Sequence, residues 1–204
     1  MKRFESVSGI AAPLMRNNVD TDAIIAARSM EGGKRDLGSV LFTNWRFDLD
    51  GNERPDFVLN QPKYRGATFI VGGANFGCGS SRESAVWALA QYGIRAVVAP
   101  SFGDIFHENS LQNGLLPIRL DEAVVHRIAD ALGRSNDAAM TIDLSGNRIL
   151  VTGLEPISFS IDPERRRALL EAKEDFDLLV EELPAIVEFE TAAGIDRPWV
   201  GLNR

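Results

Sequence analysis

The chain of 204 residues has little of what disulfide and metal sites require, since it contains one cysteine and two histidines. One cysteine excludes an internal disulfide, and so few thiol and imidazole groups leave little room for a metal site built by this chain alone. No apolar run reaches the roughly 18 residues of a membrane span, and Met1 to Ser6 lack the hydrophobic core of a secretory signal. These absences favour a cytoplasmic protein with no membrane partner.

Positive charge is also scarce, because 22 lysines and arginines face 29 acidic residues and the net charge is −7. This balance argues against a nucleic-acid-binding surface, so an anionic ligand would have to be attracted by local groups. With 45% hydrophobic residues the chain is long enough for one well-buried core and short for two. We therefore expect a single domain over residues 1–204.

Glycines and prolines divide the chain into short elements, and strands alternate with helices between residues 67 and 119. This alternation predicts an α/β fold with parallel pairing. Strands are predicted at 6–14, 21–27, 67–71, 96–99 and 116–119, helices at 82–92, 102–113, 121–132 and 162–183, and a hairpin at 140–152 around Ser145 to Asn147. A polar, glycine-bearing loop occupies 29–38.

The most informative stretch runs from Asn75 to Glu83, where an apolar strand becomes a helix. Its segment Gly79-Ser80-Ser81-Arg82 falls at the predicted helix start, where unpaired N–H groups and the helix dipole favour negative charge. Arg82 adds a planar fork that can bind a carboxylate, and a cation in the first turn is best explained by an anion beside it. The plainer interpretation makes Ser80 or Ser81 an N-cap.

Two carboxylates, Asp20 and Asp22, flank Thr21 near the start of the chain. They permit a metal-binding interpretation. Aspartates at such a position more often serve as turn and capping groups, and we expect that role here.

Four motifs in register resemble the swivel domain of the aconitase superfamily, and in particular the small subunits of 3-isopropylmalate dehydratases. They are Asn18 to Ile25, Leu41 to Phe47, Asn75 to Glu83, and Ala99 to Phe106 with its continuation to Ile118. The similarity is closest over 8–120. It implies a layered β/β/α swivel domain with a parallel-rich central sheet and flanking helices, followed by a helical extension over about 162–204.

The resemblance implies a hydro-lyase that interconverts 2-isopropylmalate and 3-isopropylmalate through 2-isopropylmaleate, in leucine biosynthesis. It assigns the base, as an alkoxide, to Ser80, with stabilising N–H groups near Gly79 and Ser81. It assigns substrate carboxylate binding to Arg82 and Arg46. The plainer interpretation of Arg46 is an arginine at the edge of the core, stacked on an aromatic ring.

The same resemblance implies a four-iron, four-sulfur cluster held by three cysteines, and this chain offers only Cys78, which the resemblance does not make a ligand. We therefore expect no cofactor or metal in this chain and an iron–sulfur large subunit as its partner, with a small dicarboxylate as substrate.

The chain departs from the family pattern at Ala26 and Ser84, and in the loop whose Arg28, Met30 and Leu37 we expect to contact the variable substrate group. This loop, residues 28–37, is expected to be poorly ordered without the large subunit. The charged residues of this loop suit a carboxylate-bearing substrate better than an isopropyl group. A related dehydratase acting on citraconate, 2-methylmalate or dimethylmalate therefore stays open. A non-catalytic, carboxylate-binding assembly subunit is the alternative from another class.

Overall fold

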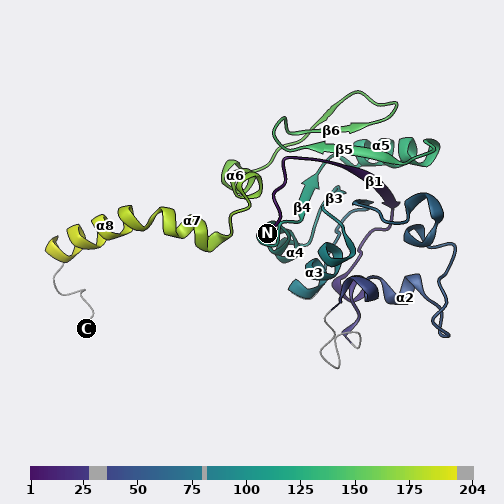
Figure 1. Cartoon of the computed structure of the whole chain (residues 1–204), viewed down its shortest axis with the longest axis horizontal. Helices are drawn as coiled ribbons and strands as arrows, with labels where there is room; N and C mark the ends of the chain where they lie inside the picture. The colour runs from purple at the N-terminus through teal and green to yellow at the C-terminus, as the bar shows by residue number, and fades with distance from the viewer. Residues whose placement is uncertain (28–35, 80–81, 197–204) are drawn as a thin grey trace.

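The computed structural model describes residues 1–27, 36–79 and 82–196. In this part of the chain seven strands form one mixed sheet in the order β4-β3-β2-β1-β5-β6-β7 (Figure 1). The strands are β1 (Ser6–Leu14), β2 (Phe69–Gly72), β3 (Ala96–Ala99), β4 (Leu116–Arg119), β5 (Ala139–Asp143), β6 (Arg148–Val151) and β7 (Ile157–Ser158).

Strand β1 joins the parallel and antiparallel halves of the sheet. Its second half pairs in parallel with β2, from Ala11 opposite Phe69 to Leu14 opposite Gly72. Its first half pairs antiparallel with β5, from Ser6 opposite Asp143 onward. One long strand thus places the β5–β6 hairpin beside the parallel strands. The predicted α/β fold with a parallel-rich central sheet is confirmed.

The helices are α1 (Thr21–Ile24), α2 (Thr43–Arg46), α3 (Glu83–Tyr92), α4 (Asp104–Gln112), α5 (Glu122–Arg134), α6 (Pro163–Glu171), α7 (Asp175–Glu181) and α8 (Leu183–Asp196). Short 3₁₀ turns lie at Gly38–Val40, Val58–Asn60 and Pro62–Tyr64. Helices α3 and α4 connect β2 to β3 and β3 to β4, and both lie on the same side of the parallel strands (Figure 1). Strands β2, β3 and β4 follow one another across the sheet in chain order. When each connection between such parallel strands is a right-handed crossover, the connecting helices lie on the same face of the sheet.

The core lies around the parallel strands. Every residue of β2 and β3 is buried, as expected for strands covered on both faces. Helix α5 packs on β1, β2 and β3 through the apolar stripe Val125, Ile128 and Leu132, each fully buried. The remaining face of α5 is polar, which explains its strong amphipathic pattern in the sequence.

The prediction of a strand over 21–27 is wrong. Thr21–Ile24 forms a helical turn, because the Asp20 side chain accepts a hydrogen bond from the Ala23 N–H at 2.6 Å and caps it. Capping here overrides the strand preference of the two isoleucines that follow, Ile24 and Ile25, which are nevertheless fully buried.

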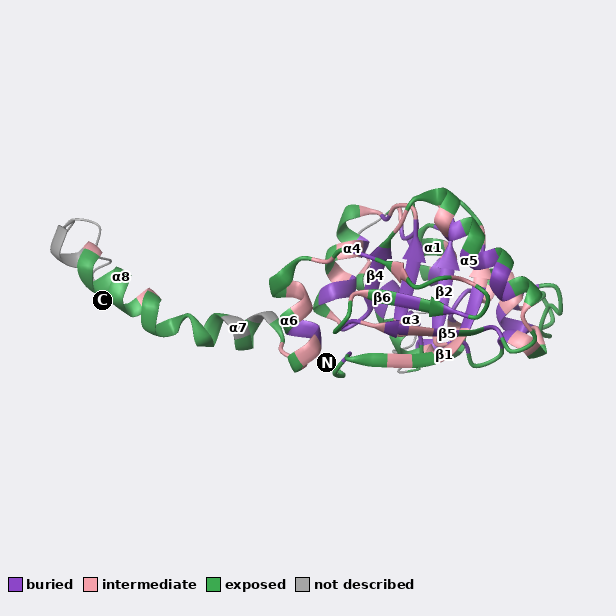
Figure 2. Ribbon diagram, turned by 90° about the horizontal axis from the view of Figure 1, so that it is seen from above, coloured by how far each residue is buried: buried purple, intermediate pink, exposed green. Residues whose placement is uncertain are grey.

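The prediction of one helix over 162–183 is also wrong, because two breaks divide this segment. Ala172 takes a left-handed conformation and ends α6. Glu174 then starts α7 with a capping box shared with Asp177. Beyond α6, helices α7 and α8 extend away from the body of the molecule, and most of their side chains are exposed (Figure 2). No helix within the described residues is long and apolar enough to cross a membrane.

Candidate active site

The glycine-rich segment after β2 is held on one side by the loop that follows β1. The Gly77 N–H donates to the Val19 carbonyl at 2.7 Å, and the Thr21 N–H donates to the Cys78 carbonyl at 2.9 Å. Asp20 and Cys78 form an isolated parallel bridge, so the two chain segments run side by side. The first and third sequence motifs therefore build one site, at the carboxyl ends of the parallel strands.

The fourth motif holds the other side of the same segment. The Phe76 N–H donates to the Ser101 carbonyl and the Gly103 N–H donates to the Phe76 carbonyl, both at 3.0 Å. Beneath them the ring of Phe76 packs edge-on against Phe106 and Phe102, at centroid distances of 5.6 and 6.5 Å. Phe102 packs against the Phe76 ring and Gly103 donates its N–H to the Phe76 carbonyl. Helix α4 therefore begins at Asp104 and not at the predicted Phe102.

Two glycines of the segment have positive φ angles, 74° at Gly77 and 91° at Gly79. At Gly77 a Cβ atom would lie 2.1 Å from the Phe106 ring, so only glycine fits. At Gly79 the nearest atom to an added Cβ would be Cβ of Asp20 at 3.5 Å, so there is room for a side chain. Glycine is favoured there by the positive φ angle and not by lack of space. The aromatic floor thus fixes the path of the backbone that leads to Ser80.

Helix α3 begins at Glu83 with Arg82 as its N-cap, in extended conformation. No side chain of the described residues caps this helix start, and because Ser80 and Ser81 lie outside the described residues, their role as caps stays a prediction. The N–H groups of a helix start and the positive end of the dipole favour an anion.

The Arg82 guanidinium, whose side chain is 25% exposed, forms an ion pair through Nη1 with Oδ1 of Asp22 on α1. Its neighbour Asp20 caps α1, so the expected capping role is confirmed for Asp20, while Asp22 serves as a charge partner. A hollow of about 210 Å³ lies between Thr21, Gly79, Arg82 and the start of α4. It is large enough for part of a small dicarboxylate.

Glu83 is tied to the end of α4. Its carboxylate accepts a hydrogen bond from Asn113 Nδ2 at 2.9 Å, and Asn113 Oδ1 accepts one from the Trp87 indole N–H at 2.9 Å. This bridge fixes the first turn of α3, and therefore Arg82, relative to α4.

Arg46 lies away from Arg82. It is 8% exposed, its guanidinium stacks on Phe47 and on Tyr92, and it donates to Asn60 Oδ1 at 3.4 Å. Tyr92 ends α3 whereas Arg82 precedes it, so the two arginines are associated with opposite ends of this helix. The contacts of Arg46 match the plainer interpretation of an arginine at the core edge, with Phe47 and Tyr92 as its rings, and its role in substrate binding stays a prediction.

The proposed specificity residues are only partly described. Leu37 is 7% exposed, belongs to the core cluster, and its N–H donates to Gln91 Oε1 at 2.7 Å. In this conformation it packs inward and presents no surface to a substrate. Arg28, Met30, Ser80 and Ser81 lie outside the described residues, as does most of the 28–37 loop.

The single thiol, Cys78, is partly buried. Burial, followed by the nearby Asp20 carboxylate, raises the pKa of Cys78 above its usual range and disfavours the thiolate. Among the described residues no three His, Cys, Asp or Glu side chains gather as a candidate metal site.

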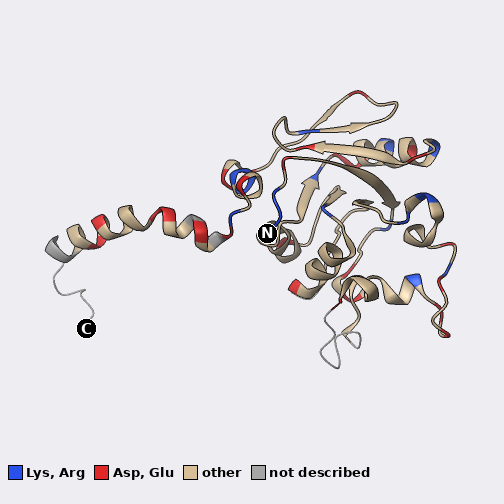
Figure 3. Ribbon diagram, in the orientation of Figure 1, with Lys and Arg blue, Asp and Glu red and all other residues tan. Residues whose placement is uncertain are grey.

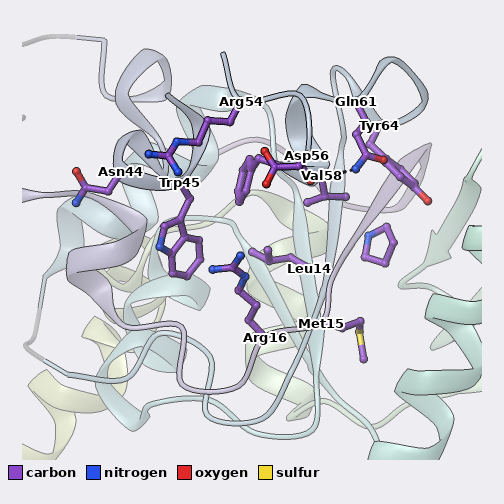
Figure 4. Close-up of a pocket in the computed structure, with 12 residues that line it drawn as sticks. Leu14, Met15, Arg16, Asn44, Trp45, Arg54, Asp56, Val58, Gln61 and Tyr64 are labelled. Atoms are coloured by element: carbon purple, nitrogen blue, oxygen red, sulfur yellow. Dashed lines mark hydrogen bonds between the residues drawn. The ribbon is translucent and has the colours of Figure 1, made fainter. Parts of the chain in front are cut away.

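A second hollow, of about 450 Å³, lies beyond the end of β1 (Figure 4). Arg16 stacks over the Trp45 ring there, with its guanidinium carbon 4.7 Å from the centroid, and Arg54 and Asp56 line the opposite wall. Arg16 was not among the predicted site residues. Its position just before the first motif and directly after a buried strand could have indicated that it lies near the site. The two hollows share no lining residue.

Comparison with known proteins agrees with this geometry. Residues 1–123 match the family described as Aconitase C-terminal domain. The chain is 48% identical over 200 residues to the 3-isopropylmalate dehydratase small subunit of Rhodospirillum centenum, covering 98% of each chain, and 48% identical to that of Roseobacter denitrificans, covering 98% of this chain and all of the relative. The chain belongs to the 3-isopropylmalate dehydratase small subunit family.

A solved structure of this family shows the same fold. The 3-isopropylmalate dehydratase of Methanocaldococcus jannaschii superposes with a TM-score of 0.63 at 28% identity, covering 90% of this chain and 98% of that one. The predicted resemblance and the swivel-type fold are thus confirmed. The match to the Aconitase C-terminal domain contains the glycine segment and Arg82, whereas α6, α7 and α8 lie beyond it.

Proposed function

We propose that this chain is the small subunit of a cytoplasmic 3-isopropylmalate dehydratase, a hydro-lyase of leucine biosynthesis. The supporting observation is near-full-length similarity to small subunits of that name, combined with the position of Arg82 at the start of α3. The reaction interconverts 2-isopropylmalate and 3-isopropylmalate by removing and re-adding water through 2-isopropylmaleate.

In this proposal the substrate carboxylate binds where α3 begins. Arg82 supplies a charge-assisted hydrogen bond, and the N–H groups near Gly79 and Ser81 add donors at the positive end of the helix dipole. The ion pair with Asp22 engages Nη1, and in this proposal the other guanidinium nitrogens bind the substrate. Arg46, buried against Phe47 and Tyr92, contributes to the core and not to this contact.

Ser80 is the proposed base that removes the proton from the carbon beside the carboxylate. A serine acts in this way only when its alkoxide is stabilised, and the N–H groups at the helix start can provide that stabilisation. The Phe76–Phe106 contact and the positive φ of Gly77 support the described backbone that precedes Ser80.

The iron–sulfur cluster that the family implies does not fit this chain. The chain has one cysteine, whereas a cluster with an open iron needs three thiolates. We propose that the cluster belongs to the large subunit, whose existence is implied by the name of the relatives.

The test is turnover of 2-isopropylmalate by the assembled two-subunit enzyme under anaerobic conditions. Ser80→Ala is expected to collapse kcat, while Ser84→Ala, a matched serine-to-alanine change in the first turn of α3, leaves kcat close to that of the unmodified enzyme. If Ser80→Ala retains kcat within about tenfold, or ~1.4 kcal/mol, the base is another group and the chain is a carboxylate-binding assembly subunit.

The same assay decides the substrate. A higher kcat/KM for isopropylmalate than for citraconate or dimethylmalate is expected. The reverse order would assign the enzyme to one of those dicarboxylates.

A further inference from the structure

Helices α7 and α8 carry large apolar side chains that are left exposed to solvent. Phe176 and Phe189 are 72% and 73% exposed, and Leu183 and Val187 are each 52% exposed. Figure 2 shows both helices extending from the body of the molecule. These side chains form the C-terminal arm, residues 176–193, whose exposed apolar members are Phe176, Leu179, Val180, Leu183, Val187 and Phe189.

The exposed apolar residues include one pair on each helix. Phe176 and Val180 are four residues apart on α7, and Leu183 and Val187 are four residues apart on α8, so the members of each pair share a helix face; the two pairs, separated by Glu182, are called the apolar stripe. A helix that exposes such a stripe to water gains little stability by itself, since most helical stability in proteins comes from packing an apolar face.

The charge of the arm restricts what can cover it. Residues 176–193 contain five acidic residues, Asp177, Glu181, Glu182, Glu188 and Glu190, and no lysine or arginine (Figure 3). Two copies of the arm would repel each other, and helices that bind membrane surfaces carry a basic polar face instead. The charge therefore favours a protein groove with an apolar floor and a basic rim.

The base of the arm is tied to the body in a defined direction. Glu181 of α7 pairs with Arg167 of α6 at 3.3 Å and with Lys173. The capping box of Glu174 and Asp177 fixes the turn between these helices. Such contacts lower the ordering cost of binding, because the arm is already helical and oriented.

The comparisons show which relatives share the arm. The match to the Aconitase C-terminal domain ends at residue 123, before the arm. The dehydratase small subunits match 98% of the chain, so their alignment reaches into the arm. Since the name of these relatives implies a large subunit, we take that subunit as the candidate for the groove.

We propose that the C-terminal arm docks the small subunit to its large subunit, with its apolar stripe seated in an apolar groove that has a basic rim. This inference depends on the proposed function, since it names the contact that assembles the same enzyme.

The test measures the affinity of the full-length chain for the purified large subunit of the same dehydratase by titration calorimetry. Leu183→Glu/Val187→Glu is expected to raise Kd at least tenfold, equivalent to about 1.4 kcal/mol. The matched control Leu49→Glu/Leu150→Glu adds the same charges at exposed leucines of the body and should leave Kd within threefold. The milder Leu183→Ala/Val187→Ala should weaken binding in the same direction without introducing charge.

Circular dichroism and thermal unfolding of each isolated variant check that the body still folds. An unchanged Kd for both arm variants would overturn the docking role. A concentration-dependent dimer of the small subunit alone, abolished by the arm variants, would assign the arm to a second copy instead. Turnover of isopropylmalate by the unmodified pair tests the proposed function separately, whatever the arm variants do.

Discussion

Arg82 and Asp22 form an ion pair between the N-cap of α3 and the one-turn helix α1, sixty residues apart in the sequence. Asp22 is 59% exposed, so the pair meets solvent at the same surface where a carboxylate would approach. The arginine that should bind substrate is therefore already positioned by a protein carboxylate, which also competes for it.

Asp22→Asn should tighten substrate binding. The amide oxygen can still accept from Arg82 Nη1 and hold the guanidinium in place, while the competing negative charge is gone. Because exposed pairs contribute about 0.2–1 kcal/mol, KM for isopropylmalate is expected to fall by up to about fivefold. Steady-state kinetics of the assembled enzyme measures this, with Asp22→Ala as the control that loses position as well as charge. A rise in KM for Asp22→Asn would show that the charge of Asp22 supports binding.

Arg46→Ala should reduce stability and leave KM unchanged. The substitution removes the stacking on Phe47 and Tyr92 and leaves the Leu41 carbonyl, which accepts from Arg46 at 3.3 Å, without this partner. An unsatisfied buried polar group costs about 1–3 kcal/mol in the free energy of unfolding. Urea unfolding and the KM of the assembled enzyme are the two measurements, with exposed Arg54 as the control site for an arginine-to-alanine change. A raised KM with unchanged stability would restore Arg46 as a substrate-binding residue.

Gly77→Ala should be more harmful than Gly79→Ala. Both glycines have positive φ angles, so each alanine costs about 1–2 kcal/mol in backbone strain. Only at Gly77 does the added Cβ meet the Phe106 ring, at 2.1 Å, so this variant must also displace the aromatic floor. Thermal unfolding of the two variants side by side tests the difference. Equal stabilities would mean that the ring moves at little cost.

Cys78 should react slowly with thiol reagents at neutral pH. Its raised pKa keeps the thiol protonated, so the alkylation rate with iodoacetamide should keep rising with pH beyond the usual range for cysteine. Since the Asp20 charge disfavours the thiolate, Asp20→Asn should lower the pKa and speed alkylation at pH 8. Asp22→Asn is the control carboxylate change. A rate for Asp20→Asn equal to that of the unmodified chain would leave burial as the sole cause.

Much of the fold could be read from local patterns. Strands β3 and β4 have the predicted boundaries, because short apolar runs between turn residues are buried as central strands. The glycine segment and the start of α3 were also predicted, since glycines and a change of hydrophobic period mark a strand-to-helix turn. The helical turn at Thr21 was not, because the Asp20 cap depends on where the chain enters the site.

The sequence alone determined the family and the chemistry available at Gly79 to Arg82, because these depend on residue type and order along the chain. Only the tertiary structure decided the surroundings of the two arginines. Arg82 and Arg46 are equally charged in the sequence, yet packing buries Arg46 against Tyr92 at one end of α3 and pairs Arg82 with Asp22 at the other. This difference results from contacts between segments far apart in the chain, since the long-range packing of β1, α1 and α3 determines which side chains converge.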